Sequence, residues 1–162
     1  MQGIQFPQNC QIVLGLTPTE GAGAALCADY ISVKNAQKVW CVIQYAQADA
    51  NAITWKVERA TSVTPTGNVA LTNTVPIWSN LDCATSDLMV RRTDAITYAS
   101  GAGPADKIIV FEIDPANLGG SYDVIAVSST TVIAADQYVS MFYLIEPRYA
   151  SAVAHVPTYL TD

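Results

Sequence analysis

Short runs in which apolar and polar residues alternate recur along this chain, and no stretch keeps a helical period. The clearest run is Ile53–Ala60, where Ile53, Trp55 and Val57 are apolar and the residues between them are polar. Successive side chains of a strand point to opposite faces, so this run predicts a strand with one buried and one solvated face. Lys38–Ala46 is apolar on both faces, which is typical of a central strand in a sandwich. We therefore expect an all-β protein.

Turn-forming residues separate these runs along the whole chain. The strongest breakers are Pro65-Thr66-Gly67, Gly101–Pro104 and Leu118-Gly119-Gly120. Asp114–Asn117 predicts a short helical turn capped by Asp114, whereas glycines disfavour a helix in the Ala-rich segment Ala22–Ala28. Further strands are predicted at Cys10–Leu16, Tyr30–Lys34, Asn68–Leu71, Leu88–Thr93, Lys107–Asp114, Tyr122–Val127 and Val139–Glu146.

Many short strands at regular spacing favour a sandwich or a barrel. We predict a single-domain β-sandwich, jelly-roll-like, over residues 10–147. Within it, Gln47–Ala52 contains Asp49 and Asn51 and is expected to join the strands on either side as a hairpin loop.

The two ends of the chain differ from the predicted sandwich. Pro147 follows the last predicted strand, and a proline ring cannot donate to a strand ladder, so residues 148–162 are expected to leave the sheet as a C-terminal arm. Residues 1–9, with Phe6-Pro7, form an N-terminal arm of similar apolar character. Disordered tails are usually more polar, so both arms are expected to dock onto this domain or onto a neighbour.

Charged residues make up only 14% of the chain, against 51% apolar residues, whereas soluble domains average about 25% charged. The longest apolar runs, such as Met141–Ile145, are far shorter than the about 20 residues of a membrane-spanning helix, so no membrane association is expected. A surface so poor in charge is expected to be covered in part by copies of this chain or by a larger assembly. Only Arg91 and Arg92 are adjacent among the basic residues, so nucleic acid is not an expected partner.

No catalytic motif is present: the sequence lacks a G-x-S-x-G elbow, a P-loop, H-E-x-x-H and a calcium loop. A Ser-His-Asp triad would need His155, which lies in the C-terminal arm rather than on a rigid strand. Glu112 and Asp114 would share one strand face, as a glycosidase pair requires, but a solvated strand face produces such pairs routinely. We predict that the protein is not an enzyme.

Metal and cofactor sites are not expected either. The four cysteines, Cys10, Cys27, Cys41 and Cys83, lack the close pairs of a structural zinc site. We expect them to be reduced and structural, with a disulfide between two of them left open.

The three tryptophans leave one binding function open. Trp55 alternates with the apolar face and is expected in the core. Trp40 and Trp78 have no such assignment, and exposed on one concave face they would form a platform for sugars. Buried tryptophans are the commoner case.

Four groups of residues follow one another in an order typical of one family. They are Gln37-Lys38-Val39, Thr54–Ala60, Val110–Pro115 with Leu118 and Gly120–Asp123, and Tyr143–Ala150. Through them, about two-thirds of the chain resembles the small structural proteins encoded beside the major coat protein in tailed bacteriophages. The most specific part is the final apolar strand closed by Pro147-Arg148-Tyr149.

The resemblance implies a capsid decoration, or cement, protein. Such proteins are jelly-roll or related sandwiches, commonly trimers, that sit where coat subunits meet and clamp them on the outside of the capsid. The implied partners are the major capsid protein and further copies of this chain, with no cofactor. The implied location is the capsid surface of the virion, after synthesis in the host cytoplasm. Many weak contacts add up in such an assembly through effective concentration.

Partner contacts are expected in the two arms, because arginine and tyrosine are enriched in interface hot spots. The candidate residues are Phe6, Pro7, Arg148, Tyr149, Tyr159 and Leu160. A local salt bridge with Glu146 is an equal alternative for Arg148. Two other functions stay open: a phage tail or baseplate component, and a carbohydrate- or receptor-binding sandwich.

Overall fold

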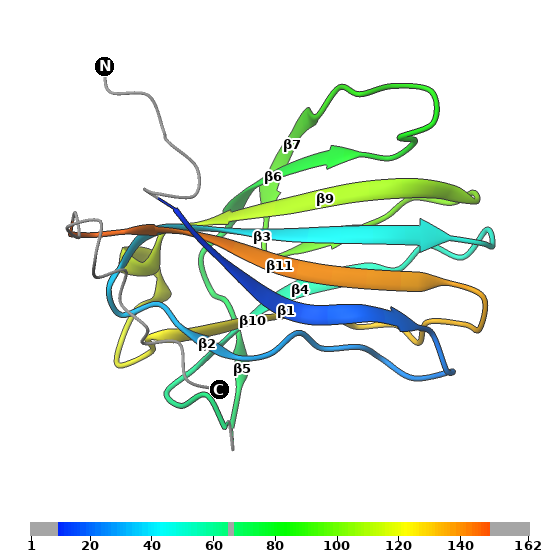
Figure 1. The fold of residues 1–162 in the computed structure, drawn as a ribbon. Helices are drawn as coiled ribbons and strands as arrows, with labels where there is room; N and C mark the ends of the chain where they lie inside the picture. The colour runs from blue at the N-terminus through cyan, green and yellow to red at the C-terminus, as the bar shows by residue number, and fades with distance from the viewer. Residues whose placement is uncertain (1–9, 65–66, 150–162) are drawn as a thin grey trace.

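Two antiparallel sheets pack face to face in the computed structural model, which describes residues 10–64 and 67–149 (Figure 1). The larger sheet has the order β1-β11-β3-β9-β6-β7. Its strands are β1 (Gln11–Glu20), β3 (Ala36–Gln47), β6 (Val75–Asn80), β7 (Val90–Ala95), β9 (Ala105–Ile113) and β11 (Tyr138–Pro147). The smaller sheet has the order β2-β10-β4-β5, with β8 also paired to β4. Its strands are β2 (Ile31–Ser32), β4 (Thr54–Ala60), β5 (Val69–Ala70), β8 (Thr97–Ala99) and β10 (Val124–Ser129).

The strand order is that of a jelly roll. The first four strands alternate between the two sheets, and so do β9, β10 and β11. The neighbours β1-β11-β3-β9 face the neighbours β2-β10-β4-β5, which is the arrangement that two Greek keys produce when wound around one core. The predicted all-β sandwich is confirmed.

Each of the predicted strands corresponds to an observed one, and two observed strands, β6 and β8, were missed. β6 contains Pro76, which a sequence pattern counts against a strand because proline lacks the N–H donor. In the structure the ladder between β6 and β7 is irregular between Val75 and Ile77, so Pro76 sits at the irregular position.

The predicted hairpin at Gln47–Ala52 was wrong. β3 pairs with β11 and β9 in the larger sheet, whereas β4 pairs with β10, β5 and β8 in the smaller sheet. The loop between them therefore crosses from one sheet to the other. Strand patterns fix which face of each strand is apolar, but they do not fix the partner strand, since pairing is decided by contacts far apart in sequence.

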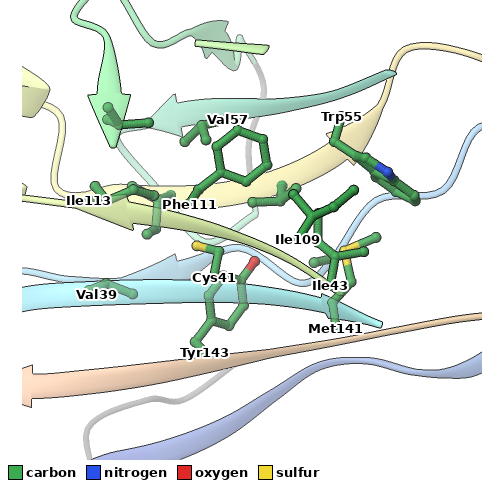
Figure 2. Close-up of a cluster of buried hydrophobic side chains, with 14 of the residues drawn as sticks. Val39, Cys41, Ile43, Trp55, Val57, Ile109, Phe111, Ile113, Met141 and Tyr143 are labelled. Carbon is green, nitrogen blue, oxygen red and sulfur yellow. The ribbon is translucent and has the colours of Figure 1, made fainter. Parts of the chain in front are cut away.

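Inward-facing side chains from both sheets form the core (Figure 2). Trp55 is fully buried, as predicted, and its ring meets that of Tyr45 edge to face at 5.8 Å. Cys41 packs in this layer as a small apolar residue, and all four cysteines are free. The core is continuous from the β1 side to the β6 side of the larger sheet. The inward face of this sheet is therefore buried against the smaller sheet.

Local turn chemistry agrees with the sequence at the helical turn. The short 3-10 helix η1 (Pro115–Leu118) follows Asp114, whose carboxylate accepts from the Ala116 N–H at 2.9 Å. It ends at Gly119, whose φ of 71° suits glycine. Ala22–Ala28 is not helical: Ala24 and Cys27 form isolated bridges with Ile133 and Ser128. In the described part of the chain, no helix is long and apolar enough to cross a membrane.

Candidate functional site

The two ends of the described chain lie together. Gln11, at the start of β1, pairs with Ile145 near the end of β11, so both strands meet the same end of the sheet. Pro147 is itself the last residue of β11 and pairs with Ala36 after a register irregularity, so the strand ends one residue beyond the predicted Glu146 and the chain leaves the sheet at residue 148. The regions expected to act as arms are thus attached side by side.

Two of the predicted contact residues belong to this end. Arg148 is exposed, and its backbone N–H donates to the Asn35 carbonyl at 2.8 Å. Tyr149 is 70% exposed. The ion pairs among residues 10–64 and 67–149 do not include Arg148, so the alternative of a pair with Glu146 is not seen. The other predicted contact residues, Phe6, Pro7, Tyr159 and Leu160, lie outside the described residues, as does His155.

A second feature, which the sequence analysis missed, is the outward face of the larger sheet. One row of paired residues crosses it from strand to strand, in the order Leu14, Phe142, Val42, Val110 and Trp78. A parallel row holds Ile12, Leu144 and Trp40. None of these side chains packs against the core, and Ile12 and Leu14 are 58% and 56% exposed. We call these eight residues the outer apolar face.

Charged side chains border the outer apolar face and contact its two tryptophans. Glu112, next to Trp40 in register, accepts from the Lys38 ammonium at 2.6 Å and from the Trp40 indole N–H at 3.3 Å. Burial works against this carboxylate, but the bond from Lys38 keeps the pKa of Glu112 below its ordinary value. The Arg91 guanidinium lies over the Trp78 ring, 5.5 Å from its centre. The face therefore has an uncharged centre and a rim of both signs.

The smaller sheet carries a cluster of ionisable and hydrogen-bonding side chains on its own outward side. Glu58 is buried and accepts hydrogen bonds from Tyr30, Asn68 and, at 2.8 Å, Ser128. Lys56 pairs with the same carboxylate at 2.5 Å. Burial alone would raise the pKa of Glu58, but the four donors lower it to about 2.

This cluster is unsuited to catalysis. A carboxylate with so low a pKa is a weak base, and its oxygens are already occupied by donors. Desolvation and the nearby Glu58 carboxylate raise the pKa of the Cys27 thiol to about 11, which keeps it protonated and poorly nucleophilic. The cluster holds a buried charge in a satisfied network, and we assign it a structural role.

A second buried charge is satisfied in the same manner. The Lys107 ammonium donates to the Gln47 side-chain oxygen at 2.8 Å and to the carbonyls of Ser100 and Gly101 at 2.9 and 3.1 Å. These bonds tie the start of β9 to the end of β3 and to the loop after β8. Desolvation lowers the pKa of Lys107, and the three acceptors compensate the burial of its charge.

Glu112 and Asp114, which were weighed as a glycosidase pair against a solvated strand face, make separate contacts. Glu112 is held by Lys38 and Trp40, whereas Asp114 lies beyond the end of β9 and caps η1. Over residues 10–64 and 67–149, no group of three or more histidine, cysteine, aspartate or glutamate side chains is arranged to hold a metal ion.

Comparison with known proteins adds one structural likeness. No protein-family model matches the sequence, and no curated protein matches it. The crystal structure of the SPBc2 prophage-derived protein YomS is similar with a TM-score of 0.46 and 8% sequence identity, covering 84% of this chain and 91% of that one.

Proposed function

We propose that this protein is a non-enzymatic structural component of a bacteriophage particle that binds the outside of the capsid and stabilises contacts between coat subunits. The observation that carries the proposal is the convergence of both chain ends at one end of the larger sheet. Because the two predicted arms are attached side by side, one end of the sandwich can contact its partner at several sites. The affinity of each contact can be modest, since linked contacts strengthen one another through effective concentration.

The exposed side chains at that end suit protein contact. Tyr149 presents a large ring to solvent, and Arg148 is exposed, outside the ion pairs of the described chain. Tyrosine and arginine contribute disproportionately to binding energy in interfaces. The low charge of the chain and the resemblance of its strand sequences to phage structural proteins support the same function.

Binding to particles tests the proposal. Purified particles of the source phage are expected to contain this chain at a copy number close to that of the coat protein, measured by quantitative mass spectrometry. Particles stripped of the chain should then rebind it, with Tyr149→Ala weakening the affinity at least about tenfold.

The matched control is Tyr138→Ala, at the start of β11 and so at the end of the strand away from Tyr149, where the tyrosine is 51% exposed. We expect this variant to bind like the wild type. Equal loss from both variants would refute the assignment of the contact to the Tyr149 end. Only a handful of copies per particle would favour a tail or baseplate component instead.

Sugar binding is a second candidate, because Trp40 and Trp78 lie on the same outward face, separated by β9. Against it, the cations Lys38 and Arg91 lie over the two rings, at 5.9 and 5.5 Å, where a sugar would stack. Titration with a glycan panel while tryptophan emission is recorded tests this function, and saturable quenching would favour it.

A further inference from the structure

We infer that the outer apolar face is a self-association surface, on which a second copy of this chain packs sheet against sheet about a two-fold axis. The inference takes from the proposed function only that the protein works through protein contacts. It concerns a different surface from the end that carries Arg148 and Tyr149.

The size of the face is sufficient for a stable dimer. Its central row crosses five neighbouring strands, from Leu14 on β1 to Trp78 on β6. Strands lie about 4.8 Å apart, and rows two residues apart along a strand are separated by about 7 Å. An uncharged row of Ser140, Gln44 and Ile108 adjoins the central row on its other side. With the width of the side chains, the three rows together measure about 25 by 20 Å. Two such faces bury roughly 1,000 Å², the area at which specific interfaces begin.

The composition of the face is that of an interface centre. Its middle is formed by Val42, Val110 and Phe142, none of them charged, with the two tryptophans beside them. Charged residues stand only at its border, where Lys38 pairs with Glu112 and Arg91 pairs with Asp94. Interfaces combine an uncharged, aromatic-rich centre with a polar rim in this way, whereas solvated sheet faces alternate with polar residues.

Shape and polarity select the second copy as the occupant. An apolar sheet face is best covered by another sheet face of similar size. Two stacked sheets lie about 10 Å apart, and the side chains of their facing sides interdigitate across that distance. This chain supplies such a face on every copy. The outward side of the smaller sheet does not qualify, since Lys56, Glu58 and Ser128 make it polar.

Two-fold symmetry makes the face complementary to itself. An axis in the interface plane, parallel to the strands and between β3 and β9, places the β11 side of one copy over the β6 side of the other. Phe142 then faces the second copy's Trp78, and Val42 faces the second copy's Val110. The mixed signs of the rim avoid a ring of like charge around the contact.

The mass of the purified full chain tests the inference, with no particle present. Light scattering or sedimentation over a concentration series should give an even multiple of 17.3 kDa. Val42→Lys places an ammonium at the centre of the face and should halve the mass. The control Val132→Lys changes an equally apolar residue, 58% exposed in the loop after β10, and should leave the mass unchanged.

A second measurement requires no variant. Trp40 and Trp78 should become less accessible to acrylamide as the protein concentration rises, while the buried Trp55 is shielded throughout. Should Val42→Lys fail to fold, as judged by its thermal melt, Val110→Lys probes the same row. A wild-type monomer at all concentrations overturns the inference. So does an odd-numbered oligomer, or association that leaves quenching unchanged, which would mean contact through another surface.

The two proposals fail separately. A chain that self-associates through this face but is absent from particles refutes the capsid function alone. A chain that binds particles as a monomer refutes the self-association surface alone.

Discussion

Glu58 is expected to make the stability of this protein fall steeply in acid. Its side chain is buried on the outward side of β4 and accepts hydrogen bonds from Tyr30, Asn68 and Ser128. Those bonds and the ion pair with Lys56 lower the pKa of Glu58 from its ordinary value of 4.5 to about 2. A carboxylate with a depressed pKa in the folded state stabilises the fold above its unfolded pKa. That stabilisation is lost as the pH falls from about 4.5 to about 2.

The magnitude follows from the two pKa values. One pKa unit corresponds to about 1.4 kcal/mol, so ionised Glu58 contributes about 3 kcal/mol to the free energy of unfolding at pH 7. Glu58→Gln keeps the size of the side chain and removes the charge. We expect it to cost about 3 kcal/mol at pH 7, with the difference from wild type shrinking to less than about 1 kcal/mol near pH 2, where Glu58 is protonated in the unfolded chain and about half protonated in the folded protein.

Urea unfolding followed by circular dichroism, at pH values from 7 to 2.5, measures this difference directly. Asp87→Asn, an exposed carboxylate in the loop between β6 and β7, is the control and should stay within about 0.5 kcal/mol of wild type. Other carboxylates also titrate in this range, but they are common to both proteins and cancel in the difference. A constant gap between wild type and Glu58→Gln across the whole pH range would refute the reasoning.

Three further predictions concern the packing of the sandwich and are all measured by urea unfolding at pH 7. Lys107→Met removes the donor to three buried oxygens and is expected to cost about 3 kcal/mol; an unchanged midpoint would mean that water replaces the ammonium. Gly21→Ala brings a Cβ to 2.1 Å from the Ala134 carbonyl oxygen and should cost about 2 kcal/mol or more. Gly23→Ala meets no neighbour and should cost only about 1 kcal/mol, for its left-handed backbone; equal costs would contradict the steric argument. Asp136 has a φ of 67°, so Asp136→Val should cost about 1–2 kcal/mol while Asp136→Gly stays near wild type. Similar effects of the two changes would show that backbone strain is not the cause.

Alternation of apolar and polar residues was sufficient to locate most of the strands, because it depends only on which side chains within one strand face the core and which face solvent. Ile53–Ala60 was predicted with its apolar face correctly assigned, and Trp55 lies in the core as that alternation requires. The cap at Asp114 was equally readable, since a capping side chain contacts a backbone N–H only two residues away. Where a local rule and the tertiary context disagreed, as at Pro76, the strand was missed.

Strand pairing and the position of the candidate surfaces required the tertiary structure. The strands before and after Gln47–Ala52 look like a hairpin in sequence, yet they belong to different sheets, because their partners β11 and β10 lie more than sixty residues away in the chain. The convergence of Arg148 and Tyr149 with the start of β1 depends on the same long-range pairing. Loop-closure entropy varies slowly with separation, so the sequence spacing carries little information about such partners.

The sequence by itself determined that the chain is an all-β sandwich with little charge and no catalytic motif, because these properties depend on composition and on the alternation within single strands. Within the sequence, Lys38–Ala46 is apolar on both faces, which is typical of a central strand in a sandwich. Only the tertiary structure decided that one of those faces lies in the core while the other, with Trp40 and Val42, points outward beside apolar residues of four other strands. Burial depends on what lies across the face, and strand neighbours and opposing layers are set by contacts between residues far apart in the sequence.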